Sequence, residues 1–415
     1  MTGLRVSQYY DTLTDRTNPD NIAAGSQDQG YQLTNGIAQT ADRFDFWQTI
    51  SGDYAHLVST DRSHDWVFSV YPGFMLVQED VGPDRLYFVD FPPDPGFAWL
   101  PPLVPSNDRK RNVFFLGQQI WEYDWEPSIG DWTVDTFSDH DFSLGAPGYA
   151  YLTGLDFSEV DPSIAVAVNN VGVLFNSEDG GVTWNTSNSD GPGSQWLYGT
   201  AILTSSLDAD VAWVGGSGYS NPPVYRTENG GRSWKKWSEG LPDTLVYCLC
   251  EAPDGSGILF AGTETSAYRR DPGASEWVDI TGNQAPVTIY WSCEALDNEN
   301  TIRFGTYGRG IWDYSLDPLG EGCFPPVDRD GDGADCDIDC DDDDPTLHPG
   351  ADEIPCDGID QNCDPTDNDA CVAPPPGSTS AVETPKEGCG CTSGGPVSGA
   401  LAGWLAVLLV ARRRR

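Results

Sequence analysis

The chain has 415 residues and a formal net charge of −42, from 64 acidic and 22 basic side chains. A surface this acidic repels nucleic acid and anionic lipid headgroups, because binding a polyanion needs clustered Lys and Arg. A nucleic-acid-binding protein is therefore excluded, and cations, neutral glycans or other proteins are the expected partners. The 46 glycines, the 31 prolines and an aromatic content of 12% favour an all-β fold with many turns.

The first residues do not form a signal peptide, because no apolar segment follows Met1–Arg5. The cysteine-rich segment and the C-terminal segment described below are typical of exported proteins. We therefore expect that the natural start lies upstream or that the gene is truncated, so that N-terminal blades are missing.

Residues from about Gln8 to Leu316 divide into roughly seven units of about 35–50 residues, a period typical of propeller blades. The repeated element is a short strand that ends in glycine and is followed by a further aromatic strand. Its copies lie at residues 22–27, 114–118, 212–216, 259–263 and 302–306. The sequence therefore predicts a β-propeller of about seven blades over residues 1–318.

Two units carry an octapeptide of the form S-x-D-x-G-x-T-W. Its residues are Ser177, Asp179, Gly181, Thr183 and Trp184 in one copy, and Thr227, Asn229, Gly231, Ser233 and Trp234 in the other. The acid or amide and the hydroxyls can close a tight turn, glycine allows unusual φ values, and the Trp ring can fill the space between sheets. We expect these residues to be structural. Weaker copies end at Trp47, Trp132 and Trp277.

These octapeptides, together with residues 25–30 and 305–310, resemble the Asp-box (BNR-repeat) propellers of the sortilin and xyloglucanase-like superfamily. The resemblance covers roughly residues 7–316 and implies the propeller fold. This superfamily includes glycoside hydrolases, a photosystem assembly factor and protein-binding sorting receptors. The resemblance therefore implies no single activity.

Catalytic motifs are weak in the propeller. Propeller sialidases need an arginine cluster, whereas Arg226, Arg232 and Arg303 fall in strand or Asp-box contexts. A glycoside hydrolase needs two carboxylates across a groove. The candidates are Asp28, Asp53, Asp61 and Asp65, and no motif singles out a pair. The histidines of this part, His56, His64 and His140, have no nucleophile motif nearby.

The sequence therefore predicts a binding or scaffold propeller whose partner is a glycan or a surface protein. A secreted glycoside hydrolase acting on polysaccharides is the alternative. Cys250 and Cys293 both precede Glu-Ala in successive units, and we predict a disulfide between them that braces two blades.

A small acidic, cysteine-rich module is expected over residues 319–372. Between Asp328 and Asp369 there are 17 acidic residues and one basic one, Arg329. Six cysteines indicate a disulfide framework formed in an oxidising compartment. They are Cys323, Cys336, Cys340, Cys356, Cys363 and Cys371. A zinc cluster is less favoured, because CxxC pairs are absent from this set and hard Asp oxygens dominate.

The loop that begins at Asp328 matches D-x-D-G-D-G with an acid at its twelfth position, a pattern that supplies calcium with carboxylates at alternate positions and glycine at the sixth. The predicted ligands are Asp328, Asp330, Asp332, Asp335, Asp337 and Asp339. Asp rather than Glu stands twelfth and no amphipathic helices flank the loop, so a thrombospondin-like or stalk-type loop fits better than an EF-hand.

Residues 340–351 and 356–364 are similar to the MopE-type metal-binding motif of secreted myxobacterial proteins. Calcium is the favoured ion. A transition metal bound with the help of His348 is an alternative. A further alternative is that the segment is an acidic linker without specific metal sites.

A linker at residues 373–387 leads to an expected C-terminal sorting tag at residues 388–415. Cys389 and Cys391 precede an apolar stretch, Gly399–Ala411, that is short for a transmembrane helix, and four arginines follow. This order resembles the MYXO-CTERM signal. The resemblance implies cleavage or lipidation at Cys389 or Cys391 and display on the bacterial cell surface, with membrane contact only through the tag. A simple C-terminal anchor is the alternative.

Overall fold

The computed structural model describes residues 7–40, 43–79, 85–106, 111–145, 149–188, 197, 201–282, 285–297, 300–316, 331–332, 334, 344–351 and 361–363, with residues 35–45 described by backbone alone where they are included. The chain separates into two compact units. One comprises Met1–Val327 with Asp335–Asp337, and the other comprises Asp328–Ala334 with Ile338–Arg415.

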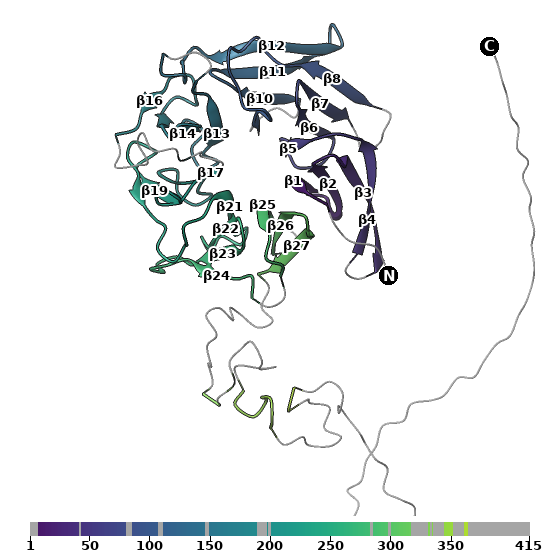
Figure 1. Ribbon diagram of the computed structural model, residues 1–415, viewed down its shortest axis with the longest axis vertical. Helices are drawn as coiled ribbons and strands as arrows, with labels where there is room; N and C mark the ends of the chain where they lie inside the picture. Colours follow the sequence, from purple (N-terminus) through teal and green to yellow (C-terminus); the bar gives the residue numbers. More distant parts are fainter. Residues whose placement is uncertain are drawn as a thin grey trace, which may run out of the picture. The chain divides into compact units, whose positions relative to one another are not determined.

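The first unit is a ring of seven antiparallel sheets, or blades, six with four strands and one with three in the described residues (Figure 1). The strands are β1 (Tyr9–Asp15), β2 (Asn18–Ser26), β3 (Gly30–Thr40) and β4 (Arg43–Ile50) in blade 1; β5 (Ala55–Val58), β6 (Trp66–Tyr71), β7 (Phe74–Glu79) and β8 (Leu86–Asp90) in blade 2; β9 (Leu103–Pro105), β10 (Asn112–Leu116), β11 (Ile120–Glu126) and β12 (Asp131–Ser138) in blade 3; β13 (Leu152–Phe157), β14 (Ala165–Asn169), β15 (Leu174–Ser177) and β16 (Asn185–Thr186) in blade 4; β17 (Ala201–Thr204), β18 (Val211–Gly215), β19 (Val224–Glu228) and β20 (Lys235–Lys236) in blade 5; β21 (Val246–Glu251), β22 (Leu259–Thr263), β23 (Ala267–Arg270) and β24 (Val278–Asp279) in blade 6; and β25 (Ile289–Leu296), β26 (Thr301–Tyr307) and β27 (Gly310–Ser315) in blade 7.

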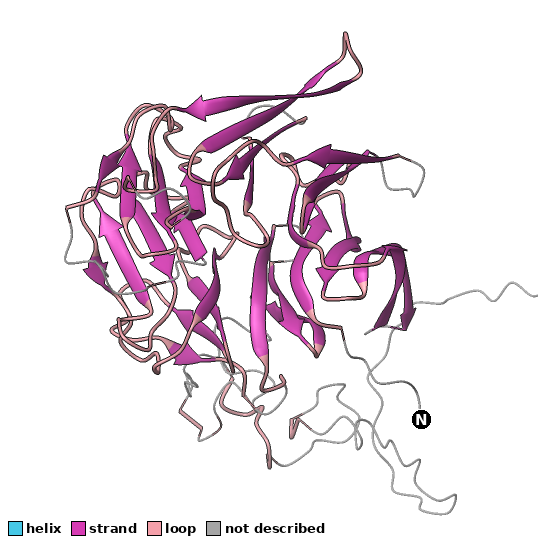
Figure 2. Cartoon of the chain, turned by 45° about the horizontal axis from the view of Figure 1, so that its top comes forward, coloured by secondary structure: helices cyan, strands magenta, loops and turns pink. Residues whose placement is uncertain are grey.

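The predicted all-β propeller of about seven blades is confirmed. Every regular element of the described residues is a strand (Figure 2). The part of the chain that the structure describes contains no helix long and apolar enough to span a membrane.

Each blade is a meander in which consecutive strands pair, with its first strand toward the centre of the ring (Figure 1). The glycine-ended repeat found in the sequence is the second strand of its blade. A Cβ atom at Gly25 would lie 2.3 Å from the Tyr54 carbonyl oxygen, and one at Gly262 would lie 2.4 Å from the Tyr290 carbonyl oxygen. Both carbonyls belong to the next blade, so glycine recurs where the inner strand of one blade meets the second strand of another.

The core lies between neighbouring blades. The second strands β10, β14, β18 and β22 are buried along their whole length, because a blade covers each of their faces. Between blades 3 and 4 the cluster includes Phe114, Leu152 and Phe175. Burial of such rings is the main favourable contribution to the free energy of folding in a fold of this kind.

The ring closes where β1 of blade 1 meets β25 and β26 of blade 7. The Thr12 and Ser292 hydroxyl oxygens lie 3.1 Å apart, and the Thr14 amide donates to Glu294 Oε2 at 2.6 Å. Arg303, which is 4% exposed, donates to Thr14 Oγ1 at 3.2 Å and to the Pro19 carbonyl at 2.9 Å. Side-chain hydrogen bonds, together with an isolated backbone bridge between Gln8 and Tyr307, therefore close the ring without a shared sheet.

The predicted disulfide between Cys250 and Cys293 is confirmed. It joins β21 of blade 6 to β25 of blade 7, with Cα atoms 6.2 Å apart. Cys248, on the same strand as Cys250, is a buried free thiol, and burial raises its pKa above the ordinary thiol value.

Candidate functional site

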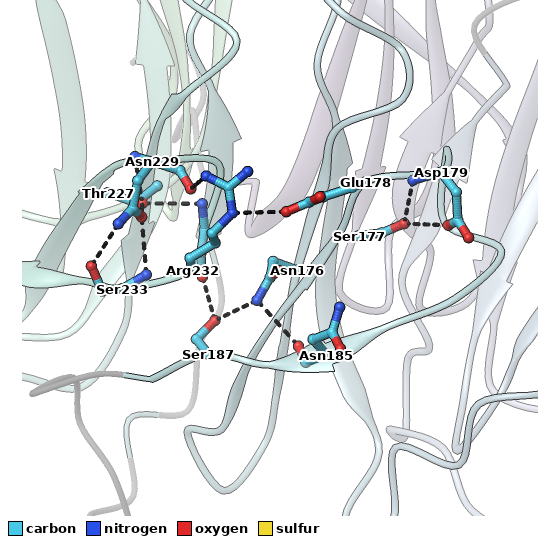
Figure 3. Close-up of polar contacts among 11 residues, drawn as sticks. Asn176, Ser177, Glu178, Asp179, Asn185, Ser187, Thr227, Asn229, Arg232 and Ser233 are labelled. Atoms are coloured by element: carbon cyan, nitrogen blue, oxygen red, sulfur yellow. Dashed lines mark hydrogen bonds and ion pairs between the residues drawn. The ribbon is translucent and has the colours of Figure 1, made fainter.

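The two octapeptides form closed turns at the entry to the outer strands of blades 4 and 5 (Figure 3). Ser177 Oγ donates to Asp179 Oδ1 at 2.8 Å, and Asp179 accepts from the Thr183 amide at 2.9 Å and the Thr183 hydroxyl at 2.6 Å. These hydrogen bonds, with the Thr183 hydroxyl first, hold the pKa of Asp179 below its usual range. In the second turn Asn229 accepts from the Ser233 amide at 3.0 Å.

The Trp rings that end these turns are buried between blades. Trp184 packs against Phe142 at 5.5 Å between centroids, and Trp234 is 1% exposed. Each indole N–H donates back into its own turn, to the Gly181 carbonyl at 2.8 Å and the Gly231 carbonyl at 3.1 Å. Trp277 is also buried, whereas Trp47 is 65% exposed on β4 and fills no space between sheets.

The two turns also contact each other across the blades. Arg232 Nε donates to Glu178 Oε1 at 2.7 Å (Figure 3). The Asn188 amide donates to the Arg232 carbonyl at 2.8 Å. The polar groups of these turns are therefore engaged in closing each turn, and Arg232 in addition joins one turn to the next blade.

The four candidate carboxylates separate into two pairs at opposite ends of the early blades. The Asp28 amide donates to Asp53 Oδ1 at 2.8 Å, which brings together the β2–β3 loop and the segment before β5. Asp61 lies after β5 and accepts from the Ser63 hydroxyl at 2.6 Å within a turn, and Asp65 follows in the same loop. Asp28 and Asp53 are the pair that the fold brings together from two separate loops.

Of the three propeller histidines, His64 is buried, and His56 and His140 are half-buried. His64 Nε2 donates to the Leu13 carbonyl at 2.9 Å, and His140 packs on Phe142 at 4.6 Å between ring centroids. Burial lowers the pKa of His56 to about 4 and lowers the pKa of His64 and of His140 below the ordinary value. Burial therefore favours the neutral form of all three rings.

Inner-strand carboxylates that the sequence reasoning did not single out tie neighbouring blades together. Asp11 Oδ2 accepts from the Leu57 amide at 2.7 Å, and Asp156 Oδ2 from the Thr204 amide at 2.7 Å. Glu251 Oε2 accepts from the Ser206 amide at 2.7 Å. Burial raises the pKa of Asp11 to about 8 and that of Asp156 to about 6. The Cys-Glu-Ala sequence that repeats in successive units could have indicated that Glu251 and Glu294 occupy equivalent inner-strand positions.

An aromatic group lies at the end of the ring where the β2–β3 and β22–β23 loops emerge. It consists of Tyr10, Tyr247, Trp291 and Tyr307, from β1, β21, β25 and β26, and is called the mouth cluster below. The Trp291 ring centroid lies 4.6 Å from that of Tyr247, 5.2 Å from that of Tyr10 and 5.3 Å from that of Tyr307. Tyr10 is buried and the other three are half-buried.

Oxygen acceptors surround the mouth cluster. The Tyr307 hydroxyl donates to Gln27 Oε1, and Glu264 Oε2 accepts from the Tyr219 hydroxyl and from the Leu245 amide. Burial raises the pKa of Tyr247 to about 12, and burial first, then Tyr307, Asp53 and Asp28, raises the pKa of Tyr10. Tyr10 and Tyr247 are thus uncharged at pH 7. Sequence reasoning missed this cluster because blade packing accounts for most aromatic residues of a propeller.

Of the predicted metal ligands, the structure describes Asp332, whose Oδ1 accepts from the Ala334 amide at 2.8 Å. Asp328, Asp330, Asp335, Asp337 and Asp339 lie outside the described residues, as do the predicted processing residues Cys389 and Cys391. Within the described residues, no three His, Cys, Asp or Glu side chains form a group able to hold a metal.

Two described segments of the acidic unit are joined by a hydrogen bond from the His348 amide to the Gln361 carbonyl at 2.9 Å. Asp344 Oδ1 closes a turn by accepting from the Thr346 hydroxyl at 2.7 Å, which holds the pKa of Asp344 below its usual range. Cys363 is disulfide-bonded. The donors of the whole motif are mainly carboxylates, which suit a hard cation.

Comparison with known families identifies the acidic segment. The family model Cu-binding_MopE, a metal-binding motif, matches residues 339–369. The predicted MopE-type motif is therefore confirmed, whereas the metal is not identified by this match. The match covers a small part of the chain, and no curated protein matches the sequence.

Solved structures resemble the propeller at low sequence identity. YCF48 from Cyanidioschyzon merolae is 10% identical with a TM-score of 0.56, and the match covers 77% of this chain and 98% of that one. The extracellular domain of the BT4673 one-component system from B. thetaiotaomicron is 16% identical with a TM-score of 0.55. That match covers 75% of this chain but only 38% of the other. U3-55K is 9% identical with a TM-score of 0.51, covering 74% of this chain and 90% of that one.

These similarities show the fold alone. The chain is a seven-bladed β-propeller protein. More particularly, it is a propeller followed by a MopE-type metal-binding motif.

Proposed function

We propose that this chain is a binding protein of the bacterial cell surface, whose propeller holds a neutral glycan at the mouth cluster and whose acidic unit binds calcium. The observation that carries the proposal is the convergence of Tyr10, Tyr247, Trp291 and Tyr307, from three blades, on one end of the ring. Export is supported by the extracellular origin of the BT4673 domain and by the disulfide between Cys250 and Cys293.

The chemistry of the mouth cluster suits an uncharged sugar. Aromatic faces stack on the C–H face of a sugar ring, while oxygens such as those of Gln27 and Glu264 accept hydrogen bonds from sugar hydroxyls. The net charge of −42 disfavours anionic polysaccharides, because the ligand would approach a surface of its own sign.

Binding without hydrolysis is favoured because the buried carboxylates are already engaged. Asp11, Asp156 and Glu251 each accept a hydrogen bond from a backbone amide of a neighbouring blade. The alternative, a secreted glycoside hydrolase, rests on Asp28 and Asp53, the one candidate pair that lies together near the mouth cluster. A hydrolase requires one such carboxyl to donate a proton and the other to act as base or nucleophile.

The test is retention of the full chain on immobilised plant and microbial polysaccharides, with mass spectrometry of the soluble fraction. Binding without released oligosaccharides, weakened about tenfold or more by Trp291→Ala, is the expected result. Trp47→Ala is the matched control, because that ring is 65% exposed on the outer strand β4. Oligosaccharides released by the wild type and absent with Asp53→Asn would establish the hydrolase instead.

Calcium is proposed for the acidic unit because the six predicted ligands supply hard oxygens at alternating positions. Their carboxylates would neutralise a bound cation and lower the repulsion within a segment that has 17 acidic residues between Asp328 and Asp369. In this proposal the ion stiffens the stalk between the propeller and the C-terminal tag, whose Cys389 or Cys391 is the processing site.

A further inference from the structure

A pocket of about 360 Å³ lies beside the mouth cluster, between the β18–β19 loop and the segment that joins β20 to β21. Its wall on the mouth side is Tyr219, which is 63% exposed and whose hydroxyl donates to Glu264. Glu264 also accepts from the Leu245 amide at 3.2 Å, next to Val246 and Tyr247 at the start of β21. Tyr219 thus links the pocket to the mouth cluster.

Backbone hydrogen bonds hold the segments at the edge of the pocket in place. The Gly218 amide donates to the Thr244 carbonyl at 2.7 Å, and the Val246 amide donates to the Gly216 carbonyl at 3.0 Å. A Cβ atom at Gly218 would lie 2.5 Å from the Thr244 carbonyl oxygen, so this approach requires glycine. Pro222, Pro223 and Pro242 line the pocket and restrict its backbone. A preformed wall loses little conformational entropy on binding.

The lining of the pocket carries one basic and one acidic side chain, Lys236 and Asp243. Lys236 also lies 3.5 Å from Glu239, which is not part of the lining. Asn221 also lines the pocket, and its Nδ2 is buried without a hydrogen-bond partner among the described residues. An unsatisfied buried amide is costly, and a small side-chain rotation that turned it toward a hydroxyl would remove that cost.

We infer that this pocket holds the terminal residue of a neutral oligosaccharide, whose chain continues across Tyr219 onto the mouth cluster; the inference rests on the proposed function. A volume of about 360 Å³ is at the lower end of ligand pockets, which suits the end of a chain rather than an internal stretch. Tyr219 supplies a stacking face, Asn221 an amide donor and Asp243 an acceptor. A charged ligand would face a lining side chain of its own sign, Lys236 for a cation or Asp243 for an anion.

The experiment measures binding of neutral oligosaccharides of glucose, mannose, galactose and N-acetylglucosamine to the full chain by calorimetry, with oligogalacturonate as the charged comparison. Tyr219→Ala and Asn221→Leu should each weaken binding of the neutral ligand about tenfold or more, and Tyr219→Phe should keep most of it. Tyr149→Ala is the matched control, because Tyr149 is 55% exposed on a loop outside the pocket. Thermal melting verifies that the variants fold.

The outcomes separate the two proposals. If the wild type binds a neutral oligosaccharide and only Trp291→Ala weakens it, the inference about the pocket is wrong and the proposed function stands. If the wild type binds no neutral oligosaccharide, or binds oligogalacturonate or a protein instead, both are overturned.

Discussion

At the scale of single residues, the position of a ring relative to the blades decides what it contributes. Trp234 is 1% exposed between blades 4 and 5, and Trp47 is 65% exposed on an outer strand. Both residues end a sequence that resembles the octapeptide. The turn of Trp234 is closed by hydrogen bonds of Thr227 and Asn229, which orient the ring inward.

We predict that Trp234→Ala lowers the free energy of unfolding by about 3–5 kcal/mol, because it removes a buried ring and leaves a cavity. Trp47→Ala should change it by less than about 0.5 kcal/mol. Urea unfolding followed by tyrosine and tryptophan fluorescence measures both. Equal effects of the two substitutions would contradict this account of the packing between blades.

At the scale of elements, the contacts between inner strands hold the ring together, and one of them is sensitive to pH. The carboxyl of Asp11 on β1 accepts from Leu57 on β5, and its pKa is raised to about 8 by burial and, second, by Glu294. In the unfolded chain the same group ionises near pH 4. Folding therefore takes up a proton between these two values.

Stability that comes from Asp11 is fully present below about pH 4 and is lost as pH rises through about 8. We predict that the melting temperature of the wild type falls over this interval and that the fall is smaller in Asp11→Asn. The control is Asp65→Asn, at an exposed position. The prediction fails if Asp11→Asn and the wild type show the same slope.

The bond between Cys250 and Cys293 spans 43 residues and joins two blades. A loop of this length predicts a stabilisation of about 2–4 kcal/mol, because the bond restricts the unfolded chain. Dithiothreitol should lower the melting temperature of the propeller in the wild type and leave it unchanged in a variant with both Cys250→Ser and Cys293→Ser. Cys248→Ala, which removes the free thiol, should keep the response of the wild type.

At the scale of the whole molecule, acidic residues are most dense in the segment between Asp328 and Asp369, which has 17 acidic residues and one basic one. We predict that calcium raises the unfolding temperature of the acidic unit and that chelation with EDTA reverses this, with the propeller transition unchanged, because four of the six predicted ligands belong to that unit. Scanning calorimetry of the full chain measures both transitions. Asp328→Asn combined with Asp330→Asn should remove the calcium effect.

If the acidic unit responds to copper and not to calcium, the proposal of calcium as its ion is wrong, and the assignment of the MopE-type motif is unaffected. Magnesium is the control for charge screening, because it prefers fewer protein oxygens than calcium does.

The fold could be predicted from the sequence because its repeat has a local cause. Gly25 and Gly262 recur where a neighbouring carbonyl leaves no room for Cβ. The mouth cluster could not be predicted, because Tyr10 and Trp291 are distant in sequence and meet only when the ring closes. Asp28 and Asp53 could be listed among many acids, but their pairing depends on two loops from different blades.

The order of the last strands determines how the ring would respond to a pull on the chain that leaves it after Leu316. Such a force would peel β27 from β26 and then β26 from β25, one hydrogen-bonded pair at a time. At Cys293 the covalent bond to Cys250 passes the load to blade 6, so the extension stops before the rest of the ring opens. Under such a force the seventh blade would unfold first, and the disulfide would limit how far the chain extends.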